Sequence, residues 1–413
     1  MYGFMAGVVA RPRKGIMNRS HRVRLYPNNI QKTYFRKACG VARFTYNWAL
    51  EEWKKQYEAG GKPSSYGLKR RFNSIKRKEF PFVVEVTKTA AERSFTNLNV
   101  AFNGFFSRVK AGKKPGYPKF KKRGIRDSFY ISNDKFKLNG KSIRVPKLGW
   151  VRMAETLRLQ GKVLSAVVSC TADKWFVSIS VQIPDKERNE NQVRSVVGID
   201  LGVSKLATLS DGTVFENIRT TKKYEKKLRR ANKSLARKVK GSNNRDKAKM
   251  VLSKLHYKIG CVRKDYIHKM TSAIANKYTD VCLEDLNVFG MVKNRRLSKV
   301  ISDAAFYEIR RQLEYKADKV HLVNRYFPSS KLCMQCGQKH DMPLNQRIFK
   351  CDCGYGPIDR DLNASQNILR QGLPDIKPVE MEALVDSGVV NETAVCEAGN
   401  THRITEGILS DFL

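Results

Sequence analysis

Three acidic residues stand where a carboxylate could do chemistry. Asp200 ends the apolar segment VVGID, Glu284 ends the apolar segment VCLE, and Asp361 precedes Leu-Asn-Ala at the start of an expected helix. A carboxylate among buried apolar residues is costly unless a cation pairs with it. Three converging carboxylates can hold two Mg²⁺ ions, one activating water and the other stabilising the leaving 3′ oxygen of a phosphodiester. Each acid taken singly could instead be a salt-bridge partner or a cap, and ATP-binding folds of the actin class also begin with GIDLG.

A second candidate site is a cluster of four of the nine cysteines within 21 residues. Two residues separate Cys333 from Cys336, and one residue separates Cys351 from Cys353. Four thiolates at this spacing suit tetrahedral Zn²⁺, and a site closed by four protein ligands is structural rather than catalytic. Free thiols or an iron–sulfur site are the alternatives. The remaining cysteines are scattered, which indicates a reducing compartment instead of a disulfide framework.

The charge of the chain points to a polyanionic partner. The 413 residues include 80 Lys and Arg against 38 Asp and Glu, a net charge of +42. Such a charge destabilises a compact chain unless a polyanion offsets it, so we expect nucleic acid, with an acidic membrane surface as the weaker alternative. The sequence contains no apolar run of about 18 residues, so it predicts no membrane span. At the N-terminus a short apolar stretch precedes the basic residues instead of following them, so we do not expect a signal peptide. Residues 374–413 are acidic and are expected to form a flexible tail.

The elements that must position these residues follow from hydrophobic periodicity. Apolar residues at helical spacing predict a helix after Pro27, which Asn28 or Asn29 can cap, and helices over about 87–110 and 302–319. Residues 219–240 predict a long basic helix. Strand-like segments indicate a small β-barrel-like module at 22–26, 128–132, 142–145, 162–170 and 175–183.

The segment 110–123 (KAGKKPGYPKFKKR) has seven bases and two aromatic residues without helical period. A solvated basic loop is one interpretation. We favour a loop that clamps a nucleic-acid strand, in which Tyr117 and Phe120 stack on bases. The lysines that would then contact phosphates are Lys119, Lys121 and Lys122.

Together these patterns resemble TnpB, the transposon-encoded RNA-guided DNA endonuclease related to type V CRISPR effectors. The resemblance runs from Arg22 to about Gly372. It rests on RLYPN, RFTYNWAL, GYPKFKK, PKLGWVRM, GIDLGV, LEDLN, KNRRLS, SDAAFYEIRRQLEYKA, YFPSSKLCMQCG and DRDLNASQNIL. It implies an α/β multidomain fold: an oligonucleotide-binding-like β-barrel (wedge) with a helical recognition insertion, and an RNase H-like RuvC nuclease domain interrupted by a zinc-binding target-strand loading domain.

The resemblance also implies a division of the chain. The expected parts are an N-terminal segment with the first wedge strand (1–27), the recognition insertion (28–125), the wedge barrel (126–192), the first RuvC part (193–331), the zinc-binding domain (332–356), the second RuvC part (357–373) and the acidic tail (374–413).

By the family's motifs, the nuclease triad and Mg²⁺ ligands are Asp200, Glu284 and Asp361. Asp359 is the weaker third ligand because the family's DxN pattern falls on Asp361 and Asn363. The expected zinc ligands are the four clustered cysteines, with His340 expected at the surface. Two positions that match the contact with a short target-adjacent DNA motif are Tyr66 and Lys88. The chain departs from the family at the one-residue spacing of its second cysteine pair and at Ile358, where members have histidine.

The implied function is an enzyme that uses a transposon-derived guide RNA and a target-adjacent motif to bind double-stranded DNA. One Mg²⁺-dependent RuvC site would cut both strands. We expect a monomer with one RNA, without a membrane partner, in the cytoplasm of a prokaryote at its nucleoid. The alternatives are a catalytically silent RNA-guided repressor, which would lack a triad acid, a DNA transposase, and an RNase H-like nuclease without a guide.

Overall fold

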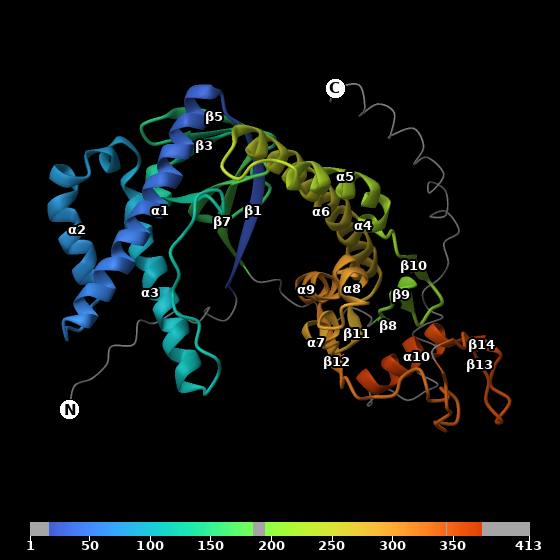
Figure 1. Cartoon of the computed structure of the whole chain (residues 1–413). Helices are drawn as coiled ribbons and strands as arrows, with labels where there is room; N and C mark the ends of the chain where they lie inside the picture. Colours follow the sequence, from blue (N-terminus) through green and yellow to red (C-terminus); the bar gives the residue numbers. More distant parts are fainter. Residues whose placement is uncertain (1–15, 185–194, 344, 374–413) are drawn as a thin grey trace, which may run out of the picture. The chain divides into compact units, whose positions relative to one another are not determined.

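A computed structural model describes residues 16–184, 195–343 and 345–373. The described residues form two compact units, one of 16–184 together with 239–257, and one of 195–238 together with 258–343 and 345–373 (Figure 1). Within the described ranges, no helix combines the length and apolar character that crossing a membrane requires. The tail predicted at 374–413 lies outside the described residues.

The first unit is built on a sheet of seven strands in the order β2-β6-β7-β1-β5-β4-β3. Neighbouring strands are antiparallel throughout. In the described pairing β2 and β3 are the end strands, so closure into a barrel stays a prediction. The strands are β1 (Ile16–Tyr26), β2 (Ser128–Ser132), β3 (Lys137–Asn139), β4 (Ser142–Val145), β5 (Gly149–Met153), β6 (Lys162–Thr171) and β7 (Lys174–Pro184).

Strand β1 is longer than the sequence predicted. The expected strand covered 22–26, but β1 pairs with β7 from Ile16 opposite Pro184 to Leu25 opposite Trp175. Only Val23 and Leu25 of β1 are buried. The first half of the strand is therefore held by backbone pairing, which hydropathy alternation does not reveal.

Helices α1 (Asn29–Glu58), α2 (Ser65–Glu79) and α3 (Lys88–Lys110) complete this unit. Asn28 caps α1 as expected, because its side chain accepts a hydrogen bond from Gln31 N while the Gln31 side-chain oxygen accepts one from Asn28 N. The helix predicted over 87–110 is confirmed as α3. Helix α1 packs on the sheet through Phe35, whose ring lies 5.7 Å from Phe129 and 5.0 Å from Trp175.

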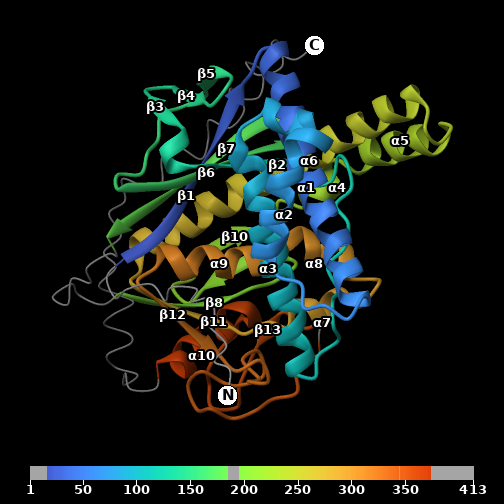
Figure 2. The same cartoon turned by 90° about the vertical axis from the view of Figure 1, so that its left-hand side faces the viewer.

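The second unit has a sheet of five strands in the order β10-β9-β8-β11-β12. Strands β8, β11 and β12 run parallel to one another, whereas β9 pairs antiparallel with both of its neighbours, β8 and β10. The sheet lies between α9 on one side and α10 on the other (Figures 1 and 2). The strands are β8 (Val196–Asp200), β9 (Lys205–Leu209), β10 (Val214–Glu216), β11 (Asp280–Glu284) and β12 (Lys319–Val323).

The helices of the second unit are shorter than predicted where the backbone turns. The basic helix expected over 219–240 is split at Tyr224 into α4 and α5, and Ala305 with a φ of 55° separates α8 from α9. The helices are α4 (Thr220–Lys223), α5 (Glu225–Ala236), α6 (Asn243–Lys277), α7 (Val288–Val292), α8 (Ser298–Ala304), α9 (Phe306–Lys316) and α10 (Arg360–Gly372), and the part of α6 before residue 258 belongs to the first unit.

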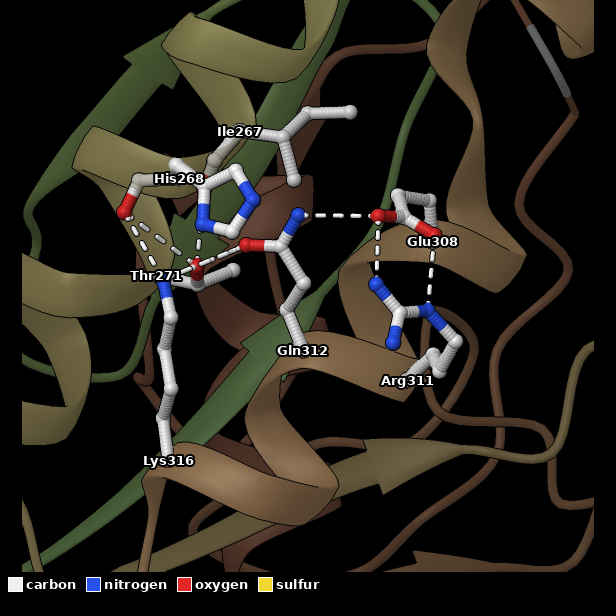
Figure 3. A network of polar contacts seen from close by, with 7 residues as sticks. All are labelled: Ile267, His268, Thr271, Glu308, Arg311, Gln312 and Lys316. Atoms are coloured by element: carbon white, nitrogen blue, oxygen red, sulfur yellow. Dashed lines mark hydrogen bonds and ion pairs between the residues drawn. The ribbon is translucent and has the colours of Figure 1, made fainter. Parts of the chain in front are cut away.

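A polar network fixes α9 against α6 (Figure 3). The buried Thr271 Oγ1 lies 2.8 Å from Gln312 Oε1, and Lys316 Nζ donates to Thr271 Oγ1 at 2.7 Å. Gln312 Nε2 in turn donates to Glu308, which also binds Arg311 through two hydrogen bonds of 2.8 Å. Thr271 and Gln312 are fully buried, and each has further partners in this network, so their polar atoms are satisfied inside the core.

Candidate active site

Strand alternation brings Asp200 and Glu284 to one face of the sheet. Val197 and Ile199 of β8 join the core formed with α6 and α9, whereas Val196 packs against α10. Because side chains alternate along a strand, Asp200 belongs to the α10 face. The same reasoning places Glu284 beside Cys282, which also packs against α10. Strands β8 and β11 run parallel with Ile199 opposite Leu283, so their carboxyl ends meet.

Asp361 reaches the same place because α10 lies directly on β8. Gly198 makes this possible, since a Cβ there would stand 2.7 Å from the backbone nitrogen of Leu369 and nearer still to the Ser365 carbonyl oxygen. Asp361 is in the first turn of α10. The three predicted carboxylates therefore come from two strand ends and one helix start.

The electrostatics show that these carboxylates share one environment. Burial, and next the negative charges of Glu284 and Asp361, raise the pKa of Asp200 to about 7, while Arg360 opposes that rise. Burial also raises the pKa of Glu284, against a hydrogen bond from the Ser329 hydroxyl. A buried group of like charges favours a cation. The donor set thus fits a hard divalent ion such as Mg²⁺, which prefers carboxylate oxygens.

Asp359 has a different role from Asp361. Its Oδ1 accepts hydrogen bonds from the backbone nitrogens of Asp361 and Leu362, at 2.8 and 3.3 Å, and so caps α10. Its other oxygen forms an ion pair with Lys205 Nζ at 2.8 Å. Lys205 and these backbone donors hold the pKa of Asp359 below its usual range against the effect of burial. Both oxygens are engaged, which supports Asp361 as the metal-facing residue.

Two asparagines of α10 tie the candidate site to the cysteine cluster. Asn363 Oδ1 accepts from Met334 N at 3.2 Å, and its Nδ2 donates to the Leu332 carbonyl at 2.8 Å. Asn367, one turn on, donates to the carbonyls of Leu332 and Ser329 at 2.7 and 2.8 Å. Both asparagines are buried. Sequence reasoning noted Asn363 but missed Asn367 and Ser329, although the four-residue asparagine spacing on a helix was a usable signal.

The four predicted cysteines do converge. Their sulfur atoms all lie within 4.8 Å of one another, with Cys333 Sγ 3.7 Å from Cys353 Sγ and Cys336 Sγ 3.5 Å from Cys351 Sγ. Tetrahedral Zn²⁺ with bonds of about 2.3 Å places sulfurs about 3.8 Å apart. The cluster therefore fits Zn²⁺ despite the one-residue spacing of its second pair.

The surroundings of the cluster hold one departure from expectation. His340, predicted at the surface, is half-buried with Nε2 3.1 Å from Cys351 Sγ. Ile358, where the family has histidine, lies in strand β14 (Ile358–Asp359), which pairs with β13 (Ile348–Phe349). Ile358 packs against the small core of Cys333 and Phe349, an apolar use of that position.

The positions predicted to contact nucleic acid lie in the first unit. Tyr66 of α2 is 79% exposed, and Lys88 at the start of α3 is also exposed. Tyr117 packs edge-on against Phe102 and Phe105 and is 43% exposed, so its stacking on a base stays a prediction. Phe120 is 44% exposed.

The lysines of the same loop differ among themselves. Lys121 Nζ lies 4.1 Å from the centre of the Tyr46 ring, and the Lys121 backbone forms hydrogen bonds in both directions with the Asn47 side chain. Lys119 and Lys122 are exposed. The loop is thus anchored on α1 at Lys121, and its contacts with phosphate stay a prediction.

Three family models match this chain. OrfB_IS605, described as "Probable transposase", matches residues 178–295. A helix-turn-helix domain of the same family matches 17–62, which here comprises β1 and the single helix α1. A Cas12f1-like TNB domain matches 306–368, the segment with the cysteine cluster.

Named relatives extend over most of the chain. A protein of Escherichia coli (strain K12) named "Putative RNA-guided DNA endonuclease InsQ" is 34% identical, covering 85% of this chain and 91% of the relative. A Streptomyces pristinaespiralis protein with the same functional name is 32% identical over 86% of this chain and 90% of its own. The solved Cas12f1–sgRNA–target DNA complex shares the fold, with a TM-score of 0.53, 16% identity and 82% of each chain covered.

Proposed function

The chain belongs to the TnpB family, and we propose that it is an RNA-guided DNA endonuclease. A guide RNA from the encoding element would select the target by base pairing, while the protein reads a short adjacent motif and the shape of the duplex. The guide would also offset the net charge of +42. We propose a monomer with one RNA that acts on double-stranded DNA at the nucleoid of a prokaryote.

The observation that carries the nuclease assignment is the convergence of Asp200, Glu284 and Asp361. All three acids are present, so the catalytically silent repressor lacks its distinguishing feature. Burial first, and then the charges of Glu284 and Asp361, raise the pKa of Asp200, which supports a cation among these acids. Such a cation site is what a metal-dependent nuclease requires.

The three carboxylates would hold Mg²⁺, which when bound activates water and stabilises the leaving 3′ oxygen. The chain's own groups prepare this site. Ser329 orients Glu284 through its hydroxyl, and Asp359 caps α10 so that Asp361 starts a fixed helix. One site of this kind would cut the two strands in turn. The cysteine cluster would hold a structural Zn²⁺ in the target-strand loading domain.

The test is cleavage by the RNA-bound protein carrying Asp200→Ala. We expect loss of cleavage with RNA and target binding retained. The matched control is Asp265→Ala, which removes a 66% exposed acid of α6 that forms an ion pair with Lys269. Retained cleavage by Asp200→Ala would overturn the site assignment.

The guide is tested separately by sequencing the RNA that co-purifies with the protein expressed from its native locus. One discrete RNA ending in sequence that flanks the gene supports guided recognition. Metal-dependent cleavage that proceeds equally without RNA would instead identify an unguided nuclease.

A further inference from the structure

A pocket of about 220 Å³ opens at the end of β11, beside Glu284. Its floor is apolar and includes Leu201, Leu283 and Leu286. Two aromatic side chains border it, Phe289 from α7 and Tyr307 from the first turn of α9. The nuclease chemistry proposed above makes no use of this pocket.

The bordering aromatic residues are unusually exposed for their size. Phe289 is 79% and Tyr307 67% exposed, whereas the neighbouring Phe306 is 2% exposed. Lys293 Nζ lies 5.3 Å from the centre of the Phe289 ring. Apolar rings kept in water beside a pocket indicate a partner with a flat face. In a chain that binds nucleic acid, the flat face available for stacking is a base.

Two arginines also line the pocket, and their positions are fixed. Arg310 Nη1 donates to Asp285 Oδ1 at 2.7 Å, and Arg325 bonds to the other oxygen of the same carboxylate. Arg325 first, and Arg310 with it, hold the pKa of Asp285 below its usual range. Asp285 balances part of their charge, so these arginines act as oriented N–H donors toward the edge of a base.

We propose that this pocket receives one unpaired nucleobase of the strand being cut, stacked on Phe289 and Tyr307. The inference rests on the proposed nuclease function, because Glu284 belongs to both the pocket and the expected metal site. The volume is below the roughly 300–1,000 Å³ of pockets for drug-sized ligands, which suits a single base. Seating that base would hold its backbone beside the carboxylates, so the pocket fixes which phosphate is cut.

The first experiment measures single-strand cleavage by the full-length RNA-bound protein carrying Phe289→Ala or Tyr307→Ala. Each change should slow cleavage by roughly 5- to 150-fold, the range for loss of one stacked base. Tyr315→Ala, on the same helix α9 but outside the pocket, is the matched control and should cut at the wild-type rate. Melting temperatures should stay close to wild type, because both pocket side chains are exposed.

The second experiment removes the base from the substrate instead. Abasic sites are placed one at a time around the cut. One position should slow the wild-type protein by the same factor as Phe289→Ala, and that position should have no further effect on the variant. The pocket would be ruled out if each abasic position slowed the wild type and the Phe289→Ala variant equally. It would also be ruled out if Phe289→Ala and Tyr307→Ala both cut at the wild-type rate.

These experiments distinguish failure of the proposed nuclease function from failure of the proposed base pocket. A wild-type protein that cuts no DNA, or an Asp200→Ala variant that still cuts, removes the proposed function. Normal cutting by wild type, its loss in Asp200→Ala, and indifference to Phe289→Ala remove only the base pocket.

Discussion

Gly198 and Ser365 lie in such close contact that no side chain fits at position 198, between β8 and α10. A Cβ on Gly198 would collide with the Ser365 carbonyl oxygen and stand 2.8 Å from Leu369 Cβ. Two elements far apart in the sequence therefore meet backbone to backbone, directly behind Asp200. The distance between Asp200 and Asp361 is set by this contact.

Gly198→Ala should therefore displace α10. We expect a loss of about 1–3 kcal/mol of folding free energy from overpacking, and cleavage reduced far more than stability predicts. Urea unfolding and cleavage rates measure the two effects. Gly260→Ala on α6 is the control, since nothing lies within 4 Å of a Cβ there. Wild-type cleavage by Gly198→Ala would show that the carboxylate spacing tolerates a shift of α10.

Asp359 and Asp361 should respond oppositely to the same substitution. Asp361→Asn removes a charge that the metal site needs, so cleavage should be lost at nearly unchanged melting temperature. Asp359→Asn keeps the capping oxygen and loses only the ion pair with Lys205, so most activity should remain. Asp359→Ala also removes the cap and should cost about 1 kcal/mol. If Asp359→Asn lost activity and Asp361→Asn kept it, Asp359 and not Asp361 would be the metal ligand.

Substitutions can distinguish the four cysteine ligands of zinc from the neighbouring His340. Cys353→Ser should lose the bound Zn²⁺ and lower the melting temperature, whereas His340→Ala should keep the ion with affinity weakened about 10- to 100-fold, as for a residue that bonds a ligand. Zinc content and a chelator titration measure both, with the exposed Cys261→Ser as control. Zinc retained in Cys353→Ser and lost in His340→Ala would make His340 the fourth ligand.

Zinc removal should also reduce cleavage. Asn363 and Asn367 bind the segment that leads into the first cysteine pair, and Ser329 of that segment contacts Glu284. Disorder of the cluster would therefore reach the nuclease site. The expected result is parallel loss of zinc and of cutting during chelation, with recovery on adding Zn²⁺. Full cleavage by zinc-free protein would show that the nuclease site does not depend on an ordered cysteine cluster.

The Glu308 carboxylate should give a pH-dependent contribution to stability. Hydrogen bonds from Arg311 and Gln312 lower its pKa from the usual 4.5 to about 2. Its stabilising effect is therefore complete above pH 4.5 and fades as the pH falls toward 2. Because the side chain is partly exposed, the effect should be at most about 1 kcal/mol.

The measurement is the difference in melting temperature between wild type and Glu308→Gln from pH 6 to pH 3. This difference should shrink on acidification. In an Arg311→Ala background the shrinkage should be much smaller, because the main cause of the lowered pKa is gone. A difference that is constant with pH would contradict the assignment.

The sequence was sufficient for prediction where the chemistry of a residue and the hydrophobic period of its segment indicate the same position in the structure. The strand ends at Asp200 and Glu284, the cap at Asn28 and the four cysteines follow from local pattern, and the structure brings the four cysteine sulfurs together. Local sequence pattern was insufficient where contacts between distant residues determine the structure.

The left-handed turn at Ala305 splits a segment with unbroken helical period, and the exposed half of β1 exists only through its partner β7. His340 was misplaced because no sequence spacing reveals which face of a hairpin loop turns inward. The link from Ser329 to Glu284 spans 45 residues without a local signal.

The bonds made by Asn363 and Asn367 all end on backbone atoms of residues 329–334. Any hairpin whose chain follows the same path can satisfy them, whatever its side chains. The metal-binding segment of another family member that keeps this path should therefore form the same bonds with Asn363 and Asn367 when it is grafted onto this nuclease, although its partner for Gln366 would have to replace Tyr355.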